Sequence, residues 1–140
     1  MDMETPKESL ELNCATFWKL NNEVILARYK DGIDLEIEDA VKVRDALIKL
    51  AGGRKFLGLV DARNMGGTLG RKASDYLAKD EKLNVLMMAQ ALVVNNLALM
   101  LIARFYILMS NPISEAKIFN NLEEALEWLE TKKPLLNDQG

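Results

Sequence analysis

The chain has no histidine, and this absence narrows its chemistry more than any other feature of its 140 residues. Without histidine there is no Ser-His-Asp or Cys-His nucleophile, no helical His-Glu-x-x-His zinc site and no imidazole general base near neutral pH. Enzyme chemistry would rest on carboxylates, Lys or Tyr, and Asp61 and Asp75 are the best placed carboxylates. Because no catalytic motif accompanies this pair, we expect a protein that is not an enzyme and that has no catalytic residue, metal or cofactor.

Cysteine and excess positive charge are also scarce. The single cysteine, Cys14, excludes an internal disulfide and a cysteine-cluster metal site, and its place in an apolar alternation favours a buried, unreactive thiol. With 18 basic and 21 acidic residues the net charge is −3 and no basic stripe is present, so we expect no nucleic-acid binding. The first residues, MDMETPKESL, lack a basic segment followed by an apolar one, which predicts no secretory signal and a cytoplasmic protein.

No hydrophobic run is long enough to cross a membrane, although residues 83–109 are far more apolar than their neighbours. A spanning helix needs roughly 20 consecutive apolar residues, and Asn95, Asn96 and Arg104 interrupt this stretch. We therefore expect no membrane span. Asn95-Asn96 instead predicts a junction between a buried strand and a buried helix of a soluble fold.

The length and composition are those of one globular domain. Hydrophobic residues make up 49% of the chain and charged residues 28%, which is enough apolar material for a single core. Stretches of low hydropathy are confined to the two ends. We expect a disordered N-terminus over residues 1–9, a single domain over residues 10–131 and a polar C-terminal tail over residues 132–140.

The order of strands and helices follows from apolar periodicity and from the residues that interrupt it. Within residues 10–20, every second position includes Leu12, Cys14 and Trp18, and this alternation predicts a strand. Asn21-Asn22 then predicts a hairpin turn to the next strand. We expect strands at 10–20, 23–29, 56–60, 86–94 and 115–119, a short extended piece at 33–35, and helices at 37–51, 71–82, 97–109 and 123–130. This order predicts an α/β domain with a mixed sheet of about five strands, an N-terminal hairpin followed by parallel strands, and four helices.

Four segments, taken with this order, carry a resemblance to a known family. They are DGIDLEIEDA before the first helix, FLGLVDAR, ALVVNNLALMLIARFYILMSNP and KIFNNLEEALEWL. The chain resembles, over roughly residues 17–129, the SpoIIAA-like group of the STAS superfamily, the fold of bacterial anti-sigma-factor antagonists. This group is often described jointly with the lipid-binding SEC14 (CRAL-TRIO) domain. The resemblance implies a small cytoplasmic bacterial domain, commonly dimeric, that works by binding rather than by chemistry.

The glycine-rich loop after the central strand is a candidate anion or phospho-switch site, with Gly66, Gly67, Thr68, Arg71 and Ser74 as its residues. Backbone N–H groups at a helix start and a following cation suit a phosphate. Switching antagonists of the resembled family carry a phosphorylatable serine here, in a D-S-S-G type turn, which this chain lacks. The alternative interpretation is a plain strand-to-helix connection with Thr68 as the helix N-cap.

The helix predicted at 97–109 is apolar on nearly all sides, so contact with the sheet covers only one of its faces. The candidate dimer or ligand surface consists of Leu97, Met100, Leu101, Arg104, Phe105 and Leu108. Its cover is a second copy of the chain, an unknown protein partner, or an apolar ligand. Arg104 reaches the edge of the protein, pairs with a carboxylate such as Asp61, or recognises an anionic ligand.

The function that we expect is non-catalytic bacterial regulation through protein binding, with the chain as a homodimer. The alternative is a carrier or sensor of an apolar or lipid-like small molecule that binds beneath the 97–109 helix.

Overall fold

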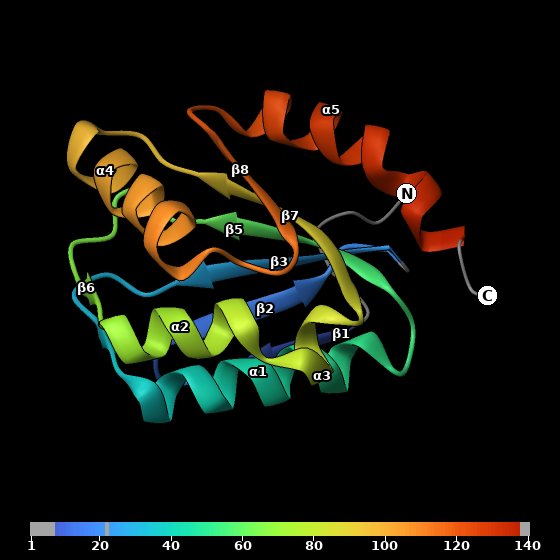
Figure 1. Cartoon of the computed structure of the whole chain (residues 1–140), viewed down its shortest axis with the longest axis horizontal. Coiled ribbons are helices and arrows are strands. Elements are labelled where there is room, and N and C mark those ends of the chain that lie inside the picture. The colour runs from blue at the N-terminus through green and yellow to red at the C-terminus, as the bar shows by residue number, and fades with distance from the viewer. Residues whose placement is uncertain (1–7, 22, 138–140) are drawn as a thin grey trace.

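A mixed sheet forms the centre of the computed structural model, which describes residues 8–21 and 23–137, and helices lie on both faces of the sheet (Figure 1). Across these described residues its six strands are, in spatial order, β1 (Glu8–Glu11), β2 (Ala15–Lys19), β3 (Val24–Tyr29), β5 (Phe56–Asp61), β7 (Met87–Val93) and β8 (Glu115–Phe119). The pairs β1-β2 and β2-β3 are antiparallel, and β3-β5, β5-β7 and β7-β8 are parallel. The predicted α/β fold, an N-terminal hairpin followed by parallel strands, is confirmed.

The remaining elements connect these strands. A separate parallel pair joins β4 (Asp34–Leu35) to β6 (Thr68–Leu69). The helices are α1 (Ile37–Ala51), α2 (Arg71–Lys79), α3 (Glu81–Asn84), α4 (Leu97–Phe105) with the π-helical turn η1 (Tyr106–Ser110), and α5 (Leu122–Lys132) with the 3-10 turn η2 (Lys133–Asn137). The helix predicted at 71–82 is two helices, because Asp80 adopts an extended conformation and caps α3 by accepting a hydrogen bond from the Leu83 N–H at 2.9 Å.

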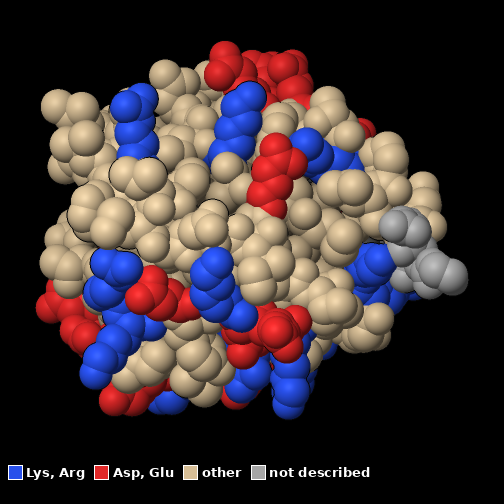
Figure 2. Space-filling view, in the orientation of Figure 1, with Lys and Arg blue, Asp and Glu red and all other residues tan. Residues whose placement is uncertain are grey.

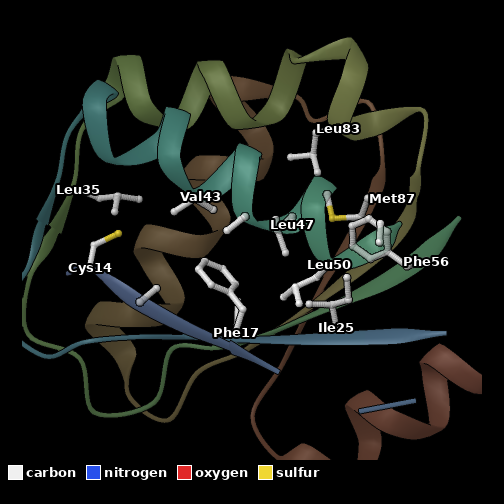
Figure 3. Packing of buried hydrophobic residues seen from close by; sticks show 14 residues of the cluster. Cys14, Phe17, Ile25, Leu35, Val43, Leu47, Leu50, Phe56, Leu83 and Met87 are labelled. Carbon is white, nitrogen blue, oxygen red and sulfur yellow. The ribbon is translucent and has the colours of Figure 1, made fainter. Parts of the chain in front are cut away.

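The two faces of the sheet have separate cores. On one face, side chains such as Phe17, Ile25 and Phe56 pack against α1 (Figure 3). On the other face, Leu57 and Leu59 pack against α5. Neighbouring residues of β5 therefore point to opposite cores, which is why its sequence FLGLV is apolar at every position.

The strand predicted at 10–20 is wrong in its extent and in its buried parity. It is a hairpin, in which the Leu12 N–H donates to the Ala15 carbonyl at 2.8 Å between β1 and β2. This turn shifts the alternation by one residue. Phe17 is fully buried in the α1 core, while Trp18, which was expected to share the face of Cys14, is half-buried. A one-residue shift moves every side chain of a strand to the opposite face.

Local signals placed the first helix correctly. α1 spans the predicted residues 37–51. Glu36 and Asp39 form a reciprocal capping box at its start. Gly52, at φ 60°, ends it in the left-handed conformation that glycine adopts without steric cost.

The strand-to-helix junction at Asn95-Asn96 is also confirmed, whereas the expected burial of the helix is wrong, because α4 is buried only at Leu99 and Ala103. β7 ends at Val93 and α4 begins at Leu97, and the Asn96 side-chain oxygen accepts a hydrogen bond from the Leu99 N–H at 2.8 Å. The helical segment ends at Asn111, which has a left-handed φ of 48°. No helix among residues 8–21 and 23–137 is long and apolar enough to cross a membrane.

The chain ends differ from the expected boundaries. Glu8 and Ser9 lie in β1, whereas residues 1–7 and 138–140, and Asn22 of the predicted turn, lie outside the described residues. The polar tail expected from residue 132 is helical as far as Asn137, because Leu136 packs into the α5 core. The cap of α5 is Asn121, whose side chain accepts a hydrogen bond from the Glu124 N–H at 2.8 Å.

Candidate functional site

The outer face of α4 and η1 is the largest concentration of exposed apolar side chains on the described elements. Leu99 and Ala103 pack inward, and the other side of the helix has no cover. Its six exposed large apolar residues and their exposed fractions are Leu97 (69%), Leu101 (55%), Ile102 (39%), Phe105 (60%), Leu108 (75%) and Met109 (44%). Figure 2 shows few charged atoms over α4, whereas acidic and basic side chains gather over α1 and α2. We call these six residues the α4 outer face.

The two other residues of the predicted surface lie at its margin. Met100 is half-buried against the inner core of α4, and Arg104 is exposed. The predicted pairing of Arg104 with Asp61 is wrong, because the Asp61 carboxylate is occupied by Arg28 and Arg63. Arg104 therefore reaches the surface, which was one of the three predicted roles.

Asp61 ends β5 and is 4% exposed. Arg63 donates to it from Nε at 2.9 Å and from Nη2 at 3.0 Å, and Arg28 donates from Nε at 3.1 Å. These hydrogen bonds, led by that of Arg63, lower the pKa of Asp61 to about 2. Asp75 accepts hydrogen bonds from Ser110 and Arg71, which lower its pKa. Hydrogen-bond donors within the protein thus favour the ionised form of each carboxylate.

Asp61 lies in a polar hollow beyond the carboxyl ends of the parallel strands, where open α/β sheets often bind ligands. The hollow is lined by Arg28, Asp61, Arg63, Asn64, Asn95, Asn120 and Asn121. Asn64 and Asn95 pair with each other through a side-chain hydrogen bond at 2.8 Å, and Asn121 caps α5. These contacts within the protein account for the polar side chains of the hollow.

The glycine-rich loop is hydrogen-bonded to residues 31–35, the segment that contains β4, rather than open to an anion. The Gly66 N–H donates to the Asp31 carboxylate at 2.6 Å, and the N–H groups of Thr68 and Gly70 donate to the carbonyls of Ile33 (3.1 Å) and Leu35 (2.9 Å). The prediction that Thr68 caps the following helix is wrong. Thr68 is a residue of β6, and Gly70 holds the cap position without a side-chain bond.

The surroundings of Thr68 and Ser74 bear on the phospho-switch, which stays a prediction. The Thr68 hydroxyl is exposed and donates to the Asp34 carboxylate at 2.8 Å, so a phosphoryl group there would meet a negative charge. Arg71, the expected phosphate partner, is paired with Asp75 at 3.1 Å. Ser74 is 5% exposed within α2. Mass spectrometry that found no phosphate on Thr68 or Ser74 in the native protein would remove the basis for this switch.

The structure brings part of the loop and part of the α4 outer face together in one groove of about 420 Å³. On the β6-α2 side it is lined by Thr68, Leu69, Arg71 and Ser74, and on the α4-η1 side by Leu101, Ile102, Phe105, Tyr106, Met109 and Ser110. Gly66 and Gly67 lie outside this groove, as do Leu97, Met100, Arg104 and Leu108. The two candidate sites predicted from the sequence therefore share a border.

A cavity of about 150 Å³ lies between the sheet, α1, α2 and α4, and its walls are almost entirely apolar. It shares Thr68, Leu69, Ile102 and Tyr106 with the groove, so the two spaces adjoin. Besides Thr68, its side chains with polar atoms are Tyr29, Gln90 and Tyr106.

These three residues were missed as site residues by the sequence reasoning. Burial raises the pKa of Tyr106 to about 12, an effect that the nearby Gln90 amide partly offsets, and burial also raises the pKa of Tyr29. Gln90 is 5% exposed, and its Nε2 has no hydrogen-bond partner in the described structure. One signal was available in the sequence. Gln90 is the only polar residue of the buried strand MMAQALV.

Comparison with known proteins gives one match. Residues 17–133 match the family described as Domain of unknown function (DUF7793). The chain belongs to the DUF7793 family. No curated protein and no solved structure matches it. The features above, an exposed apolar helix, an adjoining groove and an apolar cavity, are therefore those of a DUF7793 domain.

Proposed function

We propose that this DUF7793 domain acts by binding, without catalysis, and that the α4 outer face is its interface with a second copy of the same chain. The observation that carries the proposal is the exposure of six large apolar side chains on α4 and η1. Monomeric proteins rarely expose large contiguous apolar patches, and such patches commonly mark interaction sites. A regulatory role for the dimer extends this proposal.

A second copy of the chain fits the α4 outer face because this face is apolar and nearly without charge, so it favours an apolar partner surface. Neither α4 nor η1 has an acidic residue in its first turn, and Arg104 is the one basic residue in their sequences. A twofold pair of identical faces buries apolar side chains on both copies at once, and twofold dimers are the commonest oligomers. The exposed Arg104 side chains stay in water at the margin of such an interface.

The order of a hairpin, parallel strands and alternating helices supports the finer proposal that the fold is SpoIIAA-like, within the STAS superfamily. Domains of that group are cytoplasmic, bacterial and commonly dimeric, and we extend these three properties to this chain. The support is the shared order of elements, which by itself does not fix a function.

Light scattering of the full chain at tens of micromolar tests the dimer. We expect the wild-type mass to be that of two chains. Leu108→Glu places a charge in the interface without touching the groove or the cavity, and we expect it to be a folded monomer. Leu126→Glu is the matched control, because Leu126 is 40% exposed on α5, and it should stay dimeric. A monomeric wild type, or a dimeric Leu108→Glu variant, would contradict the proposal.

The cavity favours a second candidate function, a carrier or sensor of an apolar small molecule. Binding pockets are mainly apolar with a few placed polar groups, which describes the walls of this cavity. Solvent extraction of protein purified from its native cell, followed by mass spectrometry, tests this function. A stoichiometric small molecule supports it, and an extract without one opposes it.

A further inference from the structure

Gln90 is a polar side chain in the middle of an apolar core. It lies in β7 between Ala89 and Ala91, and it lines the cavity. Its register partner on β5 is Gly58, where a side-chain carbon would come within 2.9 Å of the Met87 sulfur. Met87 thus packs directly over Gly58, and a side chain at this position would displace it from the wall of the cavity.

The Gln90 amide has a donor that the described structure leaves unused. Nε2 is buried and makes no hydrogen bond of full geometry, and the Tyr106 phenol, whose pKa this amide lowers, can take only one of its two hydrogens. Burying an amide donor without a partner is unfavourable, so such groups in folded proteins almost always have an acceptor. Tyr106 lines the same cavity, and the Gln90 amide lowers the pKa of its phenol.

Tyr106 lines the cavity from a segment with an uncommon backbone conformation. It is the first residue of η1, the π-helical turn that continues α4. Single π-helical turns are rare and occur frequently at functional sites. Tyr106 also lies close enough to Tyr29 to raise the pKa of the Tyr29 phenol further. Tyr29, Gln90 and Tyr106 thus bring polar atoms to the cavity from β3, β7 and η1.

The walls restrict what the cavity holds. No lining residue is acidic or basic, and the raised pKa of both tyrosines shows that the surroundings disfavour negative charge. The volume, about 150 Å³, is that of an engineered apolar cavity that binds benzene, and it is small for a long acyl chain. These limits favour a compact, uncharged molecule.

We infer that the cavity binds a small, uncharged, mainly apolar molecule with one hydrogen-bond-accepting oxygen, which receives the Gln90 amide hydrogen. The inference rests on the second candidate function above and names its ligand class. The groove adjoins the cavity, because Ile102 and Tyr106 line both spaces.

A pair of isosteric probes tests the hydrogen bond. Acetophenone carries a carbonyl oxygen where α-methylstyrene carries a methylene group. Titration of the full chain, followed by methyl NMR shifts of Met87 and Leu99, should show saturable binding of both. We expect wild type to prefer acetophenone by about 2- to 10-fold, the range of one net hydrogen bond. In Gln90→Met, which keeps the size but removes the donor, the preference should vanish or reverse.

Two further variants separate the cavity from the dimer interface. Ala103→Leu adds carbon atoms at a 9% exposed wall position, and we expect it to weaken both probes at least about 10-fold in a protein whose NMR spectrum stays folded. Leu108→Glu should keep wild-type probe affinity even as a monomer. The inference is overturned if neither probe saturates, if wild type shows no preference, or if the preference survives in Gln90→Met. It is also overturned if Ala103→Leu binds the probes as wild type does.

Discussion

Replacing Asp61 with asparagine tests the ionic contacts at the end of the central strand. The carboxylate is 4% exposed and receives side-chain hydrogen bonds of 2.9 and 3.0 Å from Arg63 and of 3.1 Å from Arg28. The Arg63 N–H also donates to it at 3.2 Å. Asparagine has nearly the same shape but no charge, and its NH2 group is a donor that faces other donors.

The magnitude follows from the lowered pKa. Hydrogen bonds from Arg63 and then Arg28 lower the pKa of Asp61 from 3.8 to about 2. The charged carboxylate therefore contributes on the order of 2 kcal/mol to folding above about pH 5. The Arg28 and Arg63 side chains are 54% and 34% exposed, so their guanidinium groups stay partly hydrated without it. We expect Asp61→Asn to lower the free energy of unfolding by about 2–3 kcal/mol at pH 7. This loss lies at or just below the lower limit of the cost of breaking a buried ion pair.

The sign of the pH dependence separates this effect from a packing defect. The folded pKa lies below the unfolded one, so the contribution is present above the unfolded pKa and disappears as the pH falls through the folded one. Roughly 1 kcal/mol of it should be gone at pH 3. The stability gap between wild type and Asp61→Asn should accordingly narrow between pH 6 and pH 3.

Urea unfolding followed by circular dichroism measures this gap at each pH. At pH 7 the variant midpoint should fall by about 1–2 M urea. Glu11→Gln, which removes an exposed pair with Lys30, is the control and should shift the midpoint less. An Asp61→Asn variant as stable as wild type, or a gap that stays constant down to pH 3, would refute the reasoning.

Three further outcomes are expected. Asn96→Ala removes the cap of α4, and Asn121→Ala removes the cap of α5, so each should lower the free energy of unfolding by about 1 kcal/mol. Thermal unfolding measures this loss, and a midpoint equal to that of wild type would contradict the prediction. Gly67→Ala would place a carbon 1.7 Å from the Ile33 carbonyl oxygen, so calorimetry should show a loss of at least about 1–3 kcal/mol, and unchanged stability would mean that the loop is not held there. The Cys14 thiol is 2% exposed and burial raises its pKa, so a thiol reagent should react with the folded protein far more slowly than with the urea-unfolded chain.

The sequence by itself determined the elements whose signals lie within a few residues. α1 was predicted from residue 37 to residue 51 because its apolar stripe, its first-turn carboxylates and its terminal glycine are all local. The break at Asn95-Asn96 was predicted for the same reason, since Asn96 satisfies the first turn of the helix that it precedes. The excess of apolar side chains on α4 was also predictable from the sequence, because a helix packs against a sheet with only one of its faces.

Other features were decided by partners distant in the chain. The parity of β2 was mispredicted because a turn at residues 12–14 reset the alternation, and Thr68 became a strand residue because β6 pairs with β4. Asp61 pairs with Arg28, which is 33 residues away in the sequence, rather than with Arg104. None of these pairings leaves a periodic trace in the local sequence.

The candidate site itself is a product of tertiary structure. The groove exists because parallel crossovers bring β6 and α2 beside α4 and η1, and the cavity is enclosed by side chains from the sheet, α1, α2 and α4. The sequence shows Gln90 as the one polar residue of MMAQALV, but it does not show whether the amide has a hydrogen-bond partner. Apolar pattern and capping depend on near neighbours, whereas an unfilled volume and an unpaired donor depend on how several separate elements pack together.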